Sequence, residues 1–87
     1  MTPTLPIPDQ LTVYGADWCI DCRITRRYLD GAGIAYRYVD LKHDVASQAM
    51  LTAAGYFAIP VVTTPGGQVL IEPSDRQLAD ALASEAA

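Results

Sequence analysis

The sequence predicts an α/β protein in which a four-stranded mixed sheet carries helices on both faces, in the order β-α-β-α-β-β-α. Two observations support this prediction. Short runs rich in β-formers alternate with stretches whose apolar residues recur at helical spacing. The first two strands are joined by a helix, which implies a right-handed parallel crossover, whereas the last two are joined by a Pro-Gly-Gly turn, which implies an antiparallel hairpin.

The first half of the chain supplies a strand, a helix and a second strand. Residues 11–14 form a short apolar run and are predicted to be a buried strand. Apolar residues recur at helical spacing across residues 20–31, and Gly31 and Gly33 end that helix. Residues 35–39 alternate and are rich in β-formers, which predicts the second strand.

The second half begins with another helix, for which Asp44 is the expected N-cap and Gly55 the expected end. Two strands follow, over residues 61–64 and 68–71. Residues 65–67 read Pro-Gly-Gly, which is typical of a tight hairpin turn.

The chain is expected to end in a helix and to begin with an irregular arm. Ser74 and Gln77 match a capping box, which predicts a last helix through Leu78, Ala81 and Leu82. Residues 1–9 contain three X-Pro steps and are expected to be an extended, mobile N-terminal arm. Residues 10–87 are then expected to form a single domain.

Composition excludes several classes of protein. With 51% hydrophobic and 18% charged residues in 87, the chain is expected to be globular, with room for one domain. A net charge of −4 argues against a nucleic-acid-binding surface. No apolar run approaches the length of a membrane span, and the first residues lack the features of a secretory signal. We therefore expect a cytoplasmic protein, in which a disulfide is usually transient and catalytic.

The only two cysteines, Cys19 and Cys22, lie at the predicted turn from the first strand to the first helix. A Cys-x-x-Cys sequence at this place is typical of a redox-active thiol pair. Its spacing puts both side chains on one helix face, within reach of a disulfide. The free N–H groups at the helix start favour the thiolate of Cys19, and Cys22 lies one turn further in. We therefore expect Cys19 to attack substrate and Cys22 to resolve the mixed disulfide.

Metal binding and a structural disulfide are the alternatives for this pair. Zinc requires four ligands, and a second cysteine pair is absent. The single histidine, His43, is distant in sequence, and Asp17 and Asp21 are poor substitutes. A disulfide across two residues closes too small a loop to restrain the unfolded chain much. We expect no metal in a monomer, and a cluster shared between two subunits stays open.

Four sequence features together resemble the thioredoxin fold in its minimal glutaredoxin form. They are the Cys-x-x-Cys opening the first helix, Ile59-Pro60 before the third strand, Tyr-x-x-Val-Asp at residues 36–40, and Gly-x-x-Leu-x-x-Pro-Ser at residues 67–74. These motifs most closely resemble those of the mycoredoxins and other actinobacterial-type glutaredoxin-like proteins. The resemblance spans about residues 10 to 83.

The resemblance implies site residues beyond the two cysteines. Pro60 matches the cis-proline beside the sulfurs, and Ile59 matches the residue whose backbone pairs with substrate in strand fashion. Ser74 and Asp75 match the helix start that, in glutaredoxins, holds the carboxylate of the thiol substrate's terminal amino acid. A helix N-terminus is also an anion site in general. Simple helix capping is the alternative for Ser74, and the two roles are compatible.

Three residues next to the cysteines are further candidates. Trp18 offers a flat apolar surface to partners, with half-burial against the sheet as the alternative. Asp21 disfavours a nearby thiolate, so it is expected to make the protein a stronger reductant, by about 15 to 60 mV relative to an Asp21→Asn variant. Its alternative is to point to solvent and only favour the helix start. Arg23 is placed to bias a thiolate or steer an acidic partner, or it belongs to a solvated helix face.

The expected function is dithiol–disulfide oxidoreduction of protein disulfides, or of mixed disulfides with a low-molecular-weight thiol. No bound cofactor is expected. An external reductant, either a low-molecular-weight thiol or thioredoxin reductase with NADPH, would recycle the protein. The expected partners are disulfide-containing proteins, the thiol and a reductase, with no nucleic acid or membrane, and the expected state is a monomer. Three alternatives stay open: an iron–sulfur cluster carrier as a dimer on Cys19, an electron donor to ribonucleotide reductase recycled by thioredoxin reductase, and an adaptor with a vestigial site.

Overall fold

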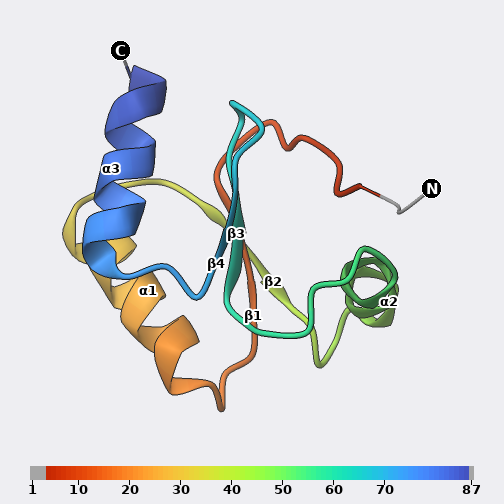
Figure 1. Cartoon of the computed structure of the whole chain (residues 1–87). Helices are drawn as coiled ribbons and strands as arrows, with labels where there is room; N and C mark the ends of the chain where they lie inside the picture. Colours follow the sequence, from red (N-terminus) through yellow and green to blue (C-terminus); the bar gives the residue numbers. More distant parts are fainter. Residues whose placement is uncertain (1–3, 87) are drawn as a thin grey trace.

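The computed structural model describes residues 4–86 and has the predicted order of elements (Figure 1). The elements are β1 (Thr12–Gly15), α1 (Ile20–Gly31), β2 (Arg37–Asp40), α2 (Val45–Ala53), β3 (Val61–Thr63), β4 (Val69–Ile71) and α3 (Asp75–Ala86). The last helix includes Leu78, Ala81 and Leu82 as predicted, and the second strand begins two residues later than predicted. None of these helices is long and apolar enough to cross a membrane.

The four strands form one mixed sheet in the order β2-β1-β3-β4. β1 pairs with β2 in parallel. Thr12 lies opposite Arg37, so the pairing begins at the first residue of each strand. β1 also pairs with β3, and β3 with β4, both antiparallel. The predicted parallel crossover and the predicted hairpin are therefore both confirmed.

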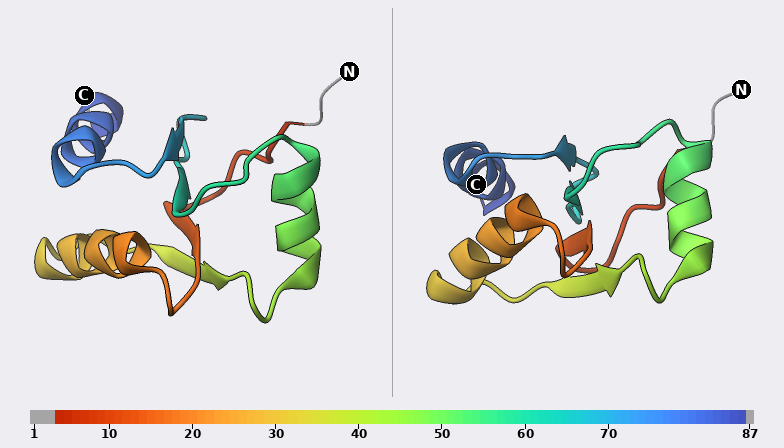
Figure 2. Two further views of the ribbon diagram at one scale, coloured as in Figure 1. Left: turned by 60° about the horizontal axis from the view of Figure 1, so that its bottom comes forward. Right: turned by 90° about the horizontal axis from the view of Figure 1, so that it is seen from below.

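The helices form a layer on each face of the sheet. α1 and α3 lie together on one face and α2 lies alone on the other, at the left and right of Figure 1 and in both views of Figure 2. The alternation along β1 explains the two layers. Val13 is buried with Leu29 and Leu78 of α1 and α3, whereas the next residue, Tyr14, is buried with Leu51 of α2.

Two helices begin at the caps that the sequence predicts. The Asp44 carboxylate accepts a hydrogen bond from the Ser47 amide at 3.0 Å and opens α2. At α3 the Ser74 hydroxyl accepts from the Gln77 amide at 3.1 Å, while the Gln77 side chain accepts from the Ser74 amide at 2.9 Å. The capping box is therefore formed in both directions, and it fixes where α3 begins.

Near its other end α3 is tied to the β3–β4 turn through Glu85. One carboxylate oxygen accepts from the Gly66 amide at 2.8 Å and the other from the Gln68 side chain at 2.7 Å. A hydrogen bond with the Thr64 side chain lowers the pKa of Glu85 most, and those from Gln68 and Gly66 lower it further. α3 is thus capped at its start by its own residues and tied to the β3–β4 turn near its end.

Residues 4–9, which precede β1, have no regular secondary structure. Leu5 is partly buried against the cluster that contains Tyr14 and Leu51. The first three residues of the expected arm lie outside the described residues. Mobility of the arm stays a prediction.

Candidate active site

The two cysteines lie at the N-terminal end of α1, directly after the turn that follows β1. Cys19 is the N-cap residue, and its sulfur accepts a hydrogen bond from the Cys22 amide at 3.2 Å. The turn is closed by the Cys19 amide, which donates to the Ala16 carbonyl at 3.1 Å. Both thiols are free, with 8% of Cys19 and 0% of Cys22 exposed. The predicted positions of the pair, one at the cap and one shielded behind it, are those seen in the structure.

The electrostatic environment separates the two thiols. Burial raises the pKa of the Cys22 thiol from its ordinary value of 9.0 to about 12, and a hydrogen bond with Cys19 adds to this shift. The backbone at Ala16 opposes the shift, and the charge of Asp21 makes a smaller contribution that raises the pKa further. Cys22 therefore stays a protonated thiol near neutral pH. Cys19 instead lies at the helix start, where its sulfur accepts the hydrogen bond from the Cys22 amide.

The loop before β3 closes one side of the cysteine pair. The Ile59–Pro60 peptide bond is cis, as the resemblance implies, and Pro60 is buried. The Cys19 thiol lies 3.8 Å from the Ile59 carbonyl, to which it donates a long hydrogen bond. The Ile59 side chain also packs against the cluster of Cys19, Cys22 and Ala16. The fold therefore brings together two segments that are 40 residues apart in the sequence.

A groove of about 530 Å³ lies between the first turn of α1 and the beginning of α3. Asp21 and Ile24 line it from α1, and residues 72–77 line it from the other side. Ser74 and Asp75, predicted from the resemblance, both border it, although the Ser74 hydroxyl is already used in the capping box. The charged residues of the groove are three carboxylates and one guanidinium: Asp21, Glu72, Asp75 and Arg76.

The glutaredoxin family model matches residues 11–70, which include both cysteines and the cis-proline loop. The chain belongs to the glutaredoxin family. No curated protein gives a significant match. Glutaredoxins are thiol–disulfide oxidoreductases that use external thiols or reductases as reductants. This glutaredoxin is accordingly a thiol–disulfide oxidoreductase.

Solved structures share the fold of this glutaredoxin. NrdH-redoxin from Escherichia coli has a TM-score of 0.75 at 20% identity, over 82% of this chain and 92% of that one. A glutaredoxin from Archaeoglobus fulgidus has a TM-score of 0.69 at 16% identity, over 84% and 85%. A mutant thioredoxin from Halobacterium salinarum has a TM-score of 0.61 at 22% identity, over 85% and 71%. At these identities the likeness establishes the thioredoxin-like fold.

The other predicted residues of this glutaredoxin lie on its surface. Trp18 is 74% exposed, so the alternative of half-burial against the sheet is wrong. Arg23 is exposed and, with Arg27, borders a shallow hollow beside Ile20 and Ile24. Among residues 4–86, no group of three or more metal-ligating side chains is close enough to hold a metal ion.

Sequence reasoning missed a cluster around Tyr38. Arg26 lies over the Tyr38 ring, 3.7 Å from its centroid, and is 3.6 Å from the Asp17 carboxylate. The Tyr38 hydroxyl donates to the same carboxylate at 3.4 Å. Burial and the charge of Asp17 raise the pKa of Tyr38 to about 12. The available signal was the alternation along residues 35–39, which puts Tyr36 and Tyr38 on the same side, and both pack against the cluster that contains Leu29 of α1.

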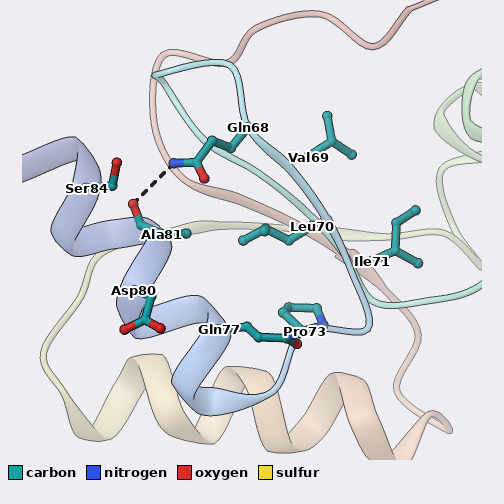
Figure 3. A pocket seen from close by; sticks show the side chains of 9 residues that line it. All are labelled: Gln68, Val69, Leu70, Ile71, Pro73, Gln77, Asp80, Ala81 and Ser84. Carbon is teal, nitrogen blue, oxygen red and sulfur yellow. Dashed lines mark hydrogen bonds between the residues drawn. The ribbon is translucent and has the colours of Figure 1, made fainter.

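Another groove of this glutaredoxin, shown in Figure 3, lies between β4 and α3. The Gln68 side chain crosses it and donates to the Ala81 carbonyl at 3.2 Å. Neither cysteine borders this groove. Its lining also includes no residue of α1, whereas the groove between α1 and α3, which likewise has no cysteine in its lining, includes Asp21 from between the two cysteines.

Proposed function

We propose that this glutaredoxin reduces protein disulfides, and mixed disulfides between proteins and a low-molecular-weight thiol, by a two-cysteine route. The Cys19 thiolate attacks one sulfur of the substrate disulfide, and the other sulfur departs as a thiol. Cys22 then attacks Cys19, so that a bond forms between the two cysteines while the bond to substrate breaks. The proton of Cys22 leaves with the second substrate thiol. The observation that carries this proposal is the 3.2 Å hydrogen bond from the Cys22 amide to the Cys19 sulfur, with the Cys22 thiol buried behind it.

We assign Trp18, Ile59 and Pro60 to the binding of the substrate segment that carries the disulfide. The Ile59 carbonyl is 3.8 Å from the Cys19 sulfur, which supports strand-like pairing of a substrate backbone next to the reacting atom. Trp18 precedes the nucleophile and is largely exposed, so its ring is available to an apolar side chain of the substrate.

We assign the groove between α1 and α3, including Ser74 and Asp75, to the low-molecular-weight thiol. Its carboxylates outnumber its guanidinium by three to one. Glutathione carries two carboxylates and one ammonium group, so its net negative charge is opposed by this groove. A thiol without net charge, such as mycothiol, avoids that repulsion. The charge of the groove therefore supports a mycoredoxin-like activity in preference to a glutathione-linked one.

A second candidate is electron donation to ribonucleotide reductase, with recycling by thioredoxin reductase and NADPH. It is favoured by the fold shared with NrdH-redoxin, which is described as a glutaredoxin-like protein with a thioredoxin-like activity profile. Both candidates fit a cytoplasmic monomer whose residues 10–87 act as one domain.

One experiment tests the function and separates the candidates. The oxidised protein is offered mycothiol, glutathione or bacillithiol, each with its own reductase system, and in parallel NADPH with thioredoxin reductase. Formation of the dithiol is measured by alkylation and mass spectrometry. We expect reduction by the mycothiol system. Reduction by thioredoxin reductase instead selects the second candidate, and no reduction in any arm contradicts the proposal.

The charge of the groove has its own test. A reporter peptide is joined by a disulfide to cysteamine, mercaptoethanol or mercaptopropionate, which are cationic, neutral and anionic. We expect kcat/KM to be highest for the cationic substrate, lower for the neutral one and lowest for the anionic one. Added salt should reduce the differences in kcat/KM between the three substrates. Glu72→Gln should raise kcat/KM for the anionic substrate by about two- to fivefold, whereas Asp80→Asn, outside the groove, is the matched control. Equal rates on the three substrates would contradict the assignment.

A further inference from the structure

Gly15, the last residue of β1, lies directly beneath the sulfur of Cys22. A Cβ atom placed on Gly15 would be 2.8 Å from that sulfur and 3.1 Å from the Cys22 Cβ. Cβ atoms do not approach other heavy atoms as closely as 2.8 Å. No side chain therefore fits at this position while Cys22 keeps its place.

The backbone of Gly15 does not itself require glycine. The glycines with positive φ are Gly33, Gly55 and Gly67, and Gly15 is extended within the sheet. It pairs with Asp40 of β2, and its carbonyl accepts from the Leu41 amide at 2.9 Å. A glycine weakens a strand and commonly marks a close approach of another group. Here that group is the Cys22 thiol.

Tyr38 bounds the same space from the side. Its ring carbon Cε1 is 3.4 Å from the point where a Gly15 Cβ would lie. The ring is held by Arg26, 3.7 Å from its centroid, and by the hydrogen bond to Asp17. The Tyr38 ring is therefore not free to move aside for a larger residue at position 15.

We propose that Gly15 is a positioning residue for the resolving step, because the space left by its missing side chain is where the Cys22 thiol is held for attack on the mixed disulfide at Cys19. This inference rests on the proposed two-cysteine route. In the step concerned, the bond between Cys22 and Cys19 forms, the bond between Cys19 and substrate breaks, and the Cys22 proton leaves with the substrate thiol. The step needs no further oxidant or reductant.

The kinetic test compares Gly15→Ala with Gly31→Ala, a control because nothing lies within 4 Å of a Cβ there. A methyl group at position 15 displaces the Cys22 sulfur but not Cys19. We expect resolution to slow by about 10- to 100-fold, as for small misplacements of reacting groups, so that the mixed disulfide accumulates. Formation of the mixed disulfide, measured by rapid quenching in a Cys22→Ser background with and without Gly15→Ala, should be unchanged. Resolution at the wild-type rate, or equal slowing of both steps, would overturn the inference.

A stability measurement keeps the inference testable should Gly15→Ala fold poorly. Removing the sulfur with Cys22→Ala leaves the 3.1 Å contact with the Cβ atom of residue 22 and the 3.4 Å contact with Tyr38. Gly15→Ala should therefore lower the melting temperature less in that background than in the wild type. Equal losses in both backgrounds would contradict the proposed contact. Failure of the wild-type protein to form any mixed disulfide would instead contradict the proposed function. The stability comparison would still test the contact between Gly15 and the Cys22 sulfur.

Discussion

The amide of Cys22 donates a hydrogen bond to the sulfur of Cys19 at 3.2 Å, while the sulfur of Cys22 is fully buried. The second cysteine thus supports the first through its backbone and keeps its own thiol away from solvent. Burial raises the pKa of the Cys22 thiol, so one turn of α1 separates the N-cap cysteine from a protected, protonated thiol.

Alkylation should distinguish the two thiols. In the reduced, folded protein we expect iodoacetamide to modify Cys19 at least about 100-fold faster than Cys22, since a thiol whose pKa is raised to about 12 is almost wholly protonated at neutral pH. Peptide mass spectrometry after timed quenching measures both rates. Cys19→Ser should abolish disulfide reduction, and Cys22→Ser should trap a mixed disulfide. Equal labelling of the two thiols would be inconsistent with this assignment.

Stability should fall at alkaline pH because of Cys22. Its pKa is raised from 9.0 to about 12, so the unfolded chain loses this proton before the folded one does. The contribution of the protonated Cys22 thiol to the free energy of unfolding is fully present below pH 9.0. It is lost as the pH rises toward about 12, at about 1.4 kcal/mol per pH unit. Urea unfolding of the reduced wild type and of Cys22→Ala, as a function of pH, measures the difference in their free energies of unfolding. The pKa values of Tyr14 and Tyr38 are also raised, but both proteins contain these residues, so their contributions cancel in the difference. A pH-independent difference would show that Cys22 ionises normally.

Asp21→Asn should shift the redox potential only slightly. The Asp21 side chain is exposed, so water screens its charge. A shift of the redox potential in the upper part of the range of about 15 to 60 mV, which was expected from the sequence, would require less polar surroundings. We expect the potential to become less negative by at most about 20 mV. Equilibration with a dithiol of known potential measures it, with Asp30→Asn at the far end of α1 as the control. A more negative potential would show that Asp21 does not disfavour the thiolate.

Ser74→Ala should destabilise the fold through α3. The hydroxyl accepts from the Gln77 amide at 3.1 Å, and losing an N-cap of this kind costs about 1 kcal/mol. Chemical denaturation gives the free energy of unfolding, and Ser74→Thr, which keeps the hydroxyl, is the matched control. An unchanged stability would mean that water replaces the cap without loss.

Features with a strong local signal were predictable from the sequence. The caps at Asp44 and Ser74, the Pro-Gly-Gly turn and the place of Cys19 at a helix start depend on residues within four positions of one another. The family resemblance added Ile59 and Pro60, because spacing alone does not indicate which loop meets the cysteines.

Features that depend on how elements pack could not be predicted. The contact between Gly15 and Cys22 joins the end of β1 to α1, and in a sequence a glycine indicates a turn as readily as a close contact. The cluster of Asp17, Arg26 and Tyr38 joins a turn, a helix and a strand. The exposure of Trp18 likewise follows from the turn that carries it, which no periodicity describes.

The attachment of α3 to the β3–β4 turn through Glu85 has a practical consequence for immobilising or labelling the protein. Ser74 borders the groove between α1 and α3, and Glu85 lies near the opposite end of the helix, so about 17 Å of helix separates them. In Figure 1 the last turns of α3 point away from the start of α1. An electrode surface or fluorophore joined through this end would therefore lie away from the start of α1, provided that the hydrogen bonds of Glu85 to the β3–β4 turn are kept.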